Sequence, residues 1–99
     1  MRVDCGAVGA SGQHVHVGWT RAELTAVREA IEVTPNFEGR PTAREIVRTA
    51  LRTPRIQAVT LDFGIAHRLA TRIVPVDLAT ATARAKLQLA VRNATHQAA

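Results

Sequence analysis

The stretch that decides the fold of this chain is Thr42-Ala43-Arg44-Glu45-Ile46-Val47-Arg48-Thr49-Ala50-Leu51-Arg52. It returns 40 residues later as Thr82-Ala83-Arg84-Ala85-Lys86-Leu87-Gln88-Leu89-Ala90-Val91-Arg92, with five of the eleven aligned positions identical. The upstream segment returns as well, because Val15-His16-Val17-Gly18-Trp19 aligns with Val59-Thr60-Leu61-Asp62-Phe63. A period near 40 residues indicates that one supersecondary unit is used twice. Each half is therefore expected to fold as strand, helix, helix.

Composition sets the size and the kind of core. The 99 residues allow one compact domain. The hydrophobic content is 46%, but Trp19, Phe37 and Phe63 are the only aromatic residues, so Ala, Val, Leu and Ile must form most of the core. We expect Trp19 and Phe63 to anchor this core, and Phe37 to plug it from a polar loop.

Cysteine usage and hydropathy bear on the compartment. The lone Cys5 cannot form an internal disulfide, which is typical of a reducing environment. The chain has no secretory h-region and no apolar run of transmembrane length. These features predict a cytoplasmic protein without a membrane partner.

The N-terminal half contains an arm and the first repeat. Residues 1–12 carry three glycines among small residues, so a flexible arm is expected, with a short strand around Arg2–Asp4 as the lesser alternative. Alternation over residues 13–19 predicts a half-buried strand. Thr20 and Glu23 then form a capping box that starts a helix, which ends near Thr34-Pro35. A second helix begins near Pro41 and stops at Pro54, which completes a first repeat over residues 13–53.

The second repeat is expected over residues 54–99. Its strand places Val59, Leu61 and Phe63 on one side and Ala58, Thr60 and Asp62 on the other. Gly64 opens a helix that Pro75 closes. Asp77 caps the last helix, which is expected to fray toward residues 96–99. Its predicted apolar stripe consists of Leu78, Ala83, Leu87, Ala90 and Val91.

The charge balance favours anionic partners. The net charge is +5, and twelve arginines stand against the single Lys86. Residues 55–99 carry six basic groups and two acidic groups, so the second half is expected to hold most of the positive field. Duplex DNA is the first partner to consider and an acidic protein surface the second. Arg44, Arg48 and Arg52 recur at four-residue spacing and form either a phosphate-binding stripe or ordinary solvated helix charges.

The order of elements and the run Gly39-Arg40-Pro41-Thr42-Ala43-Arg44-Glu45-Ile46 resemble the ribbon-helix-helix superfamily, to which the Arc and MetJ repressors belong. The resemblance covers residues 13–53 well and residues 56–93 as a weaker copy. It implies a mostly helical α+β fold in which two strand-helix-helix repeats pair into an antiparallel two-stranded ribbon with four helices. Because one chain contains both halves, the resemblance implies a monomeric pseudo-dimer, with a homodimer as the alternative.

The resemblance also implies a function and a site. The chain would be a small DNA-binding transcriptional regulator, whose ribbon enters the major groove. Base contacts would fall on the outward strand positions, and phosphates would bind at the N-terminus of the second helix, through Pro41, Thr42 and Ala43 with Arg40 and Arg44 nearby. The implied DNA-binding residues are His14, His16, Gly18, Thr60, Arg40, Thr42 and Arg44, with Ala58 and Asp62 at the remaining outward positions.

Other readings of the residues remain open. A protein-interaction module, such as a phage-type or antitoxin-like inhibitor, would also suit a short basic chain that needs no cofactor. His14 and His16 share a strand face, and Asp62 could lie opposite them, so a metal site is one interpretation. The other is that both histidines are simply exposed to solvent on the ribbon. No nucleophile and base constellation and no phosphate-cradling glycine loop is present, so the chain is not expected to be an enzyme.

Overall fold

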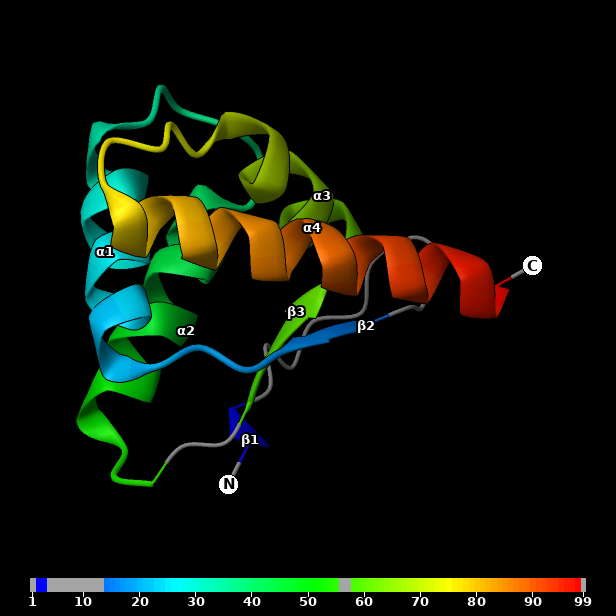
Figure 1. Ribbon diagram of the computed structural model, residues 1–99, viewed down its shortest axis with the longest axis horizontal. Coiled ribbons are helices and arrows are strands. Elements are labelled where there is room, and N and C mark those ends of the chain that lie inside the picture. The colour runs from blue at the N-terminus through cyan, green and yellow to red at the C-terminus, as the bar shows by residue number, and fades with distance from the viewer. Residues whose placement is uncertain (1, 4–13, 56–57, 99) are drawn as a thin grey trace.

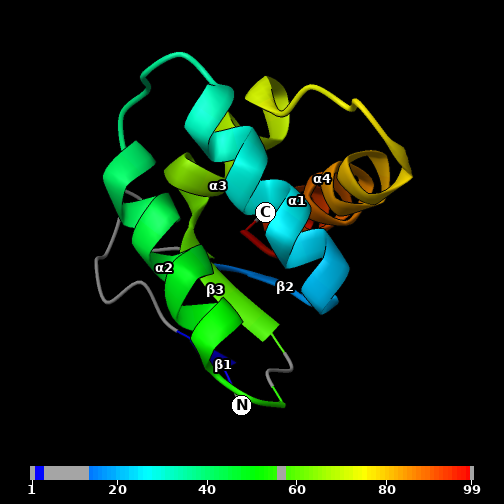
Figure 2. The same ribbon diagram turned by 90° about the vertical axis from the view of Figure 1, so that its left-hand side faces the viewer.

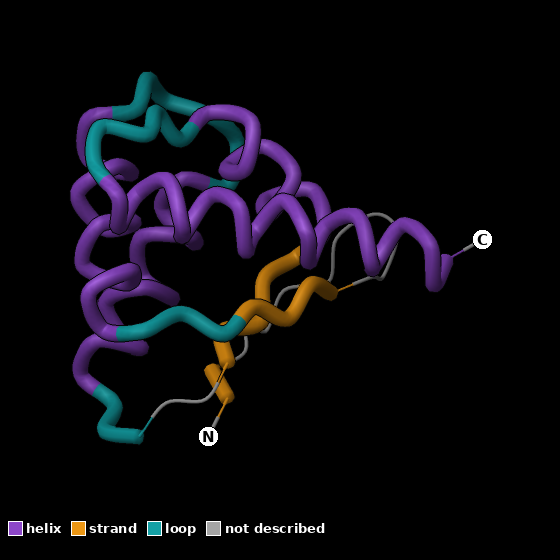
Figure 3. Tube along the Cα trace, in the orientation of Figure 1, coloured by secondary structure: helices purple, strands orange, loops and turns teal. Residues whose placement is uncertain are grey.

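The computed structural model describes residues 2–3, 14–55 and 58–98, and these residues form a small α+β fold that is mostly helical. The prediction of a mostly helical α+β fold with four helices is thereby confirmed, whereas the sheet has three strands and not the two of the predicted ribbon. Four helices lie around one small sheet (Figures 1 and 3). The described elements are β1 (Arg2–Val3), β2 (His14–Val17), α1 (Arg21–Val33), α2 (Arg40–Arg52), β3 (Ala58–Asp62), α3 (Phe63–Arg72) and α4 (Leu78–Ala98).

The sheet joins the two halves of the chain. β2 pairs antiparallel with β3, and the register places His14 opposite Asp62 and Val17 opposite Val59. β1 pairs parallel with the other edge of β3, so the strand order is β1-β3-β2. At Arg2–Val3 the alternative prediction of a short strand around Arg2–Asp4 is confirmed in place of the flexible arm, and the rest of residues 1–12 lies outside the described residues. A third strand satisfies the second edge of β3, which a two-stranded ribbon would leave unpaired.

α1 follows the sequence prediction closely. The Thr20 hydroxyl accepts from the Glu23 amide at 3.2 Å, and the Glu23 carboxylate accepts from the Thr20 amide at 2.9 Å. These two bonds are the predicted capping box, and they satisfy amides that the first helical turn leaves free. The helix ends with Thr34 as its C-cap, directly before Pro35.

A glycine positions the start of α2. Gly39 has φ 91°, which is left-handed backbone that side chains other than hydrogen rarely permit. A Cβ atom at this position would lie 2.5 Å from Cγ1 of Ile65. Gly39 therefore lets the first turn of α2 approach α3 closely.

α3 begins earlier than predicted. The Asp62 carboxylate accepts from the amides of Gly64 at 3.0 Å and Ile65 at 3.4 Å, so Asp62 is the N-cap and Phe63 already belongs to the helix. Phe63 is only half-buried, and its ring centroid lies 6.2 Å from that of His67. The prediction that Phe63 anchors the core on a strand is wrong, because the cap at Asp62 turns the chain one residue sooner.

α4 begins with the predicted cap, but the residues that it buries differ from the predicted apolar stripe. Asp77 Oδ1 accepts from the Thr80 amide at 2.8 Å, and the Thr80 hydroxyl accepts from the Asp77 amide at 3.0 Å. Leu78 was placed in the buried stripe, but its exposed fraction is 83%. The helix continues to Ala98, so the predicted fraying is not observed over its last turn. α4 packs against both α1 and α3.

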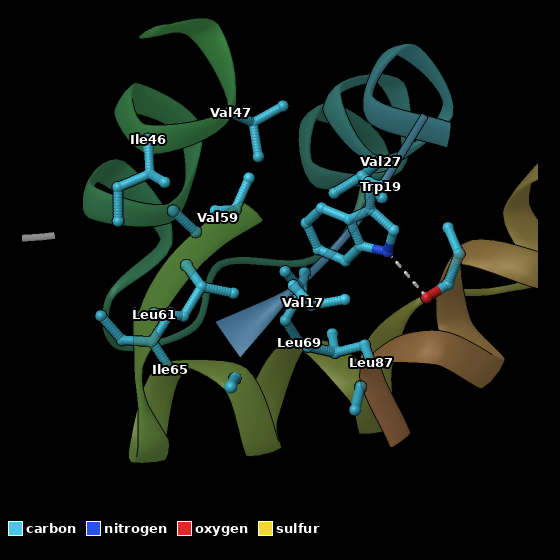
Figure 4. Packing of buried hydrophobic residues seen from close by; sticks show 14 of the residues in the cluster. Val17, Trp19, Val27, Ile46, Val47, Val59, Leu61, Ile65, Leu69 and Leu87 are labelled. Carbon is cyan, nitrogen blue, oxygen red and sulfur yellow. Dashed lines mark hydrogen bonds between the residues drawn. The ribbon is translucent and has the colours of Figure 1, made fainter. Parts of the chain in front are cut away.

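Trp19 lies at the centre of the core (Figure 4). It is 4% exposed, and its indole Nε1 donates to the Ala83 carbonyl oxygen at 3.1 Å, which ties the end of β2 to α4. Phe37 is also buried, as predicted for a loop plug. The largest fully buried aliphatic side chains surround them, namely Val15, Leu24, Val27, Ile31, Val47, Val59, Leu61, Leu69, Ile73 and Leu87.

A partly buried ion pair joins α1 to α4. Lys86 Nζ lies 2.8 Å from Glu23 Oε1, the same oxygen that accepts from the Thr20 amide. Burial alone would raise the pKa of Glu23, but the hydrogen bonds from Lys86 and Thr20 outweigh it and hold the pKa below its ordinary value. The ionised form of Glu23 is therefore favoured by folding.

We predict that Glu23→Gln destabilises the protein by about 0.5–1 kcal/mol at neutral pH, because the ion pair with Lys86 is lost while the new amide oxygen can still accept from the Thr20 amide. A lowered pKa gives stability that is present above the unfolded value near 4.5 and is lost as the pH falls through the folded value. Thermal unfolding followed by circular dichroism should therefore show that the melting temperatures of the wild-type protein and of Glu23→Gln converge below pH 4.5. A difference that persists unchanged into acid would contradict a role for the ionised carboxylate.

Candidate nucleic-acid interface

The outward positions of the two strands are not equally accessible. On β2, His16 is exposed and His14 is half-buried, and Gly18, directly after the strand, is exposed. On β3, Thr60 is only 3% exposed, and its hydroxyl oxygen lies 3.0 Å from Nδ1 of His16. Thr60 was predicted to face outward toward DNA, and the structure corrects this placement. Its hydroxyl is bonded to a neighbouring side chain and is not presented on the surface.

Asp62 is also buried, with 7% of its surface exposed. Oδ2 caps α3, while Oδ1 has no hydrogen-bond partner among the described residues. β3 is the central strand, and Val59 and Leu61 are buried on its other face. Because both faces of β3 are covered, the ribbon surface that remains accessible comes from β2.

Arg40 has a structural contact in place of the predicted phosphate contact. Its Nε donates to the Ile31 carbonyl oxygen and its Nη2 to the Glu32 carbonyl oxygen, both at 3.1 Å. These carbonyls belong to the last turn of α1, where a cation complements the helix dipole. The guanidinium of Arg40 thus closes the C-terminal end of α1.

The N-terminus of α2 offers few free amides. The Arg40 amide donates to Phe37 at 3.1 Å, the Ala43 amide donates to Gly39 at 2.9 Å, and Pro41 has no amide hydrogen. Thr42 is half-buried in the same turn. A phosphate cradle needs several amides that point at one ligand. The predicted phosphate site at this helix end therefore lacks most of its donors.

The structure instead gathers arginines along α1 and α2. The two helices lie side by side and run antiparallel (Figure 2), and an Arg21 guanidinium donates to the Leu51 carbonyl oxygen at 2.6 Å. Arg28 of α1 and Arg48 of α2 line one shared surface hollow. We call this surface the arginine face and define it by Arg21, Arg28, Arg44, Arg48 and Arg52.

Three carboxylates lie among these arginines. Glu29 and Glu32 line the hollow that holds Arg28 and Arg48. Glu32 lies 2.9 Å from Arg44 and 3.9 Å from Arg48, and Glu45 lies 3.5 Å from Arg52. Five arginines against three carboxylates leave the face a surplus of two positive charges. The side chains of Arg48 and Arg52 are 51% and 70% exposed, so solvent and large ligands can reach them.

Sequence reasoning found only part of this face. The four-residue spacing of Arg44, Arg48 and Arg52 is evident in the sequence. The sequence analysis did not predict that the arginines of α1 lie beside them. Arg21 and Arg28 are seven residues apart, which is two helical turns, so they share one side of α1. That spacing could have predicted a second row of arginines on α1. Only the packing of α1 on α2 shows that this row lies beside the arginines of α2.

Neither a metal centre nor a membrane segment is seen in the described part of the chain. Within residues 14–55 and 58–98, no three His, Cys, Asp or Glu side chains are grouped to hold a metal ion, so His14, His16 and Asp62 do not form such a group. None of the described helices is both long and apolar enough to span a membrane.

Comparisons with models of protein families, with curated proteins and with solved structures found no match for this chain.

We predict that Arg40→Gln lowers the free energy of unfolding by about 1–2 kcal/mol, because two hydrogen bonds to the end of α1 are lost. Arg68→Gln is the matched control, since Arg68 makes an exposed ion pair with Glu38 at 3.5 Å and should cost less than about 0.5 kcal/mol. Urea unfolding of both variants measures the difference. Equal midpoints for the two variants would show that Arg40 does not close α1.

Proposed function

We propose that this chain is a small DNA-binding regulator that contacts duplex DNA mainly through its phosphates. The observation that carries the proposal is the arginine face, where two packed helices place five guanidinium groups beside three carboxylates, those of Glu29, Glu32 and Glu45. Phosphate contacts supply most of the affinity of sequence-independent DNA binding, and arginine makes them bidentately. The net charge of +5 acts in the same direction.

In this proposal, few side chains would be available to recognise bases. A ribbon in the major groove would present His16, Gly18 and the half-buried His14 of β2. Histidine can hydrogen-bond to base edges, whereas glycine carries no side chain to read them. We therefore expect weak sequence preference and a strong dependence on salt concentration.

The second candidate is a protein-interaction module that binds an acidic protein. It is favoured by the burial of Thr60 and Asp62, which takes two outward strand positions away from any base-reading surface. The arginine face would then meet carboxylates in place of phosphates. Both candidates use the same surface, so DNA affinity decides between them.

We predict that the protein binds a mixed-sequence duplex at low salt and that the affinity falls steeply as salt rises. Replacing Arg28 and Arg48 together by Ala should lower the slope of log affinity against log salt by about two, since each lost phosphate contact lowers it by about one. Fluorescence anisotropy of a labelled duplex, titrated at several salt concentrations, measures both quantities.

Arg92→Ala is the control, because Arg92 is exposed on α4 and is not part of the arginine face. It should leave the slope within about half a unit of the wild-type value. Absence of binding at low salt would overturn the DNA proposal and favour the acidic protein partner. An equal loss in the control would show that general charge, and not the arginine face, causes the binding.

A further inference from the structure

β2 and α4 share one surface hollow. Its volume is about 230 Å³, and the residues that line it include His16 and Gly18 at the strand and Lys86, Leu89 and Asn93 on the helix. α4 packs against β2, and its C-terminal end projects beyond the other helices (Figure 1). Side chains of the strand and of the helix can therefore reach the same partner. We call this surface the β2–α4 hollow.

The charge around the β2–α4 hollow favours an anionic partner. No carboxylate of the described residues lines the hollow. The whole of α4, residues 78–98, contains three basic residues and neither Asp nor Glu. Lys86 is already paired with Glu23 at 2.8 Å, so the attraction comes from the net charge of the helix and not from a free ammonium group. Such a helix is suited to lie between the phosphates that border a DNA groove.

The neutral side chains of the β2–α4 hollow fit one kind of base pair. Asn93 is exposed, and its side-chain amide makes no hydrogen bond with a described residue. Leu89 is 55% exposed and precedes Asn93 by four residues, so the two lie on the same side of α4. An A·T pair presents a donor and an acceptor of adenine and the methyl group of thymine in the major groove. An asparagine amide bonds both adenine atoms, and an apolar side chain contacts the methyl group, which a G·C pair lacks.

His16 lies at the same hollow with its ring held in place. Its Nδ1 lies 3.0 Å from the Thr60 hydroxyl oxygen, and Thr60 is buried in the sheet. That contact leaves Nε2 of His16 available to a partner. A side chain that is ordered before binding loses less conformational entropy when the partner arrives. β2 therefore contributes an oriented ring, and α4 contributes an unpaired amide.

We propose that Asn93 is the specificity-determining residue of this protein and that it recognises an adenine in the major groove of duplex DNA, with Leu89 against a thymine methyl group. This inference rests on the proposed DNA binding. Recognition of one base pair agrees with the weak sequence preference expected above. The β2–α4 hollow is also continuous with the arginine face, because Arg21 begins α1 only three residues after Gly18.

Fluorescence anisotropy with two labelled duplexes tests the assignment. One is the mixed-sequence duplex, and in the other every adenine is replaced by 7-deazaadenine, which lacks the N7 acceptor but keeps the base pairing, the thymine methyl groups and the phosphates. The wild-type protein should bind the natural duplex about fivefold more tightly, because Asn93 loses one of its two hydrogen bonds on the modified duplex. Asn93→Ala should bind the two duplexes equally.

Arg92→Ala is the matched control. Arg92 is exposed and adjacent in sequence, but it lies about 100° round the helix from Asn93 and does not line the hollow, so this variant should keep the wild-type ratio of affinities. Absence of binding to the natural duplex at low salt would overturn the proposed function, and this inference with it. Salt-dependent binding in which Asn93→Ala keeps the wild-type ratio, or in which the wild-type protein binds both duplexes equally, would overturn only the assignment of Asn93.

Discussion

The central position of β3 is the constraint on which the rest of this structure depends. Both edges of the strand are paired, one with β1 and one with β2, and both of its faces contain buried residues. β2 pairs with β3 from Val59 to Asp62, and β1 pairs with Ala58 and Val59 on the other edge, so both edges contribute to satisfying the backbone hydrogen bonds of the strand. The helices must then be arranged so that their apolar sides cover the sheet. α1 packs on α2 and α4, and Trp19 connects this layer to β2 through its bond to Ala83.

Burial of β3 also changes which residues can meet a partner. In an exposed two-stranded ribbon, Thr60 and Asp62 would present their side chains to the surroundings. Here Thr60 is bonded to His16, and Asp62 caps α3. Arg40 is similarly committed to the last carbonyls of α1. Polar residues near helix ends and strand faces are therefore used for folding, and the available charge lies on the exposed sides of α1 and α2.

Two surfaces with different chemistry lie toward opposite ends of the α1–α2 pair. Arg21 and Arg52 lie at the end where α1 starts and α2 finishes, and the charge there is suited to a polyanion. Where α1 finishes, the side chains of Val33, Val74 and Val76 are exposed around an apolar groove, and Glu29 and Val33 also line the hollow that holds Arg28 and Arg48.

Local chemistry in the sequence determined much of the secondary structure. The capping box at Thr20 and Glu23, the cap at Asp77, and the prolines at 35, 41, 54 and 75 act within a few residues, so their effects could be predicted without knowledge of the fold. The buried Trp19 and Phe37 followed from the scarcity of large side chains. The apolar periodicity and the breaks at proline predicted four helices, and four are described.

Only the tertiary structure decided the third strand, the burial of Thr60 and Asp62, the role of Arg40 and the joining of Arg21 and Arg28 to the stripe on α2. Each of these depends on contacts between residues that are distant in sequence or on choices among several possible hydrogen-bond partners. Asp62, for example, could serve as a strand residue or as a cap, and the nearby amides of Gly64 and Ile65 selected the cap. A pattern of residue types records which side of an element is apolar, whereas packing determines what lies against the polar side.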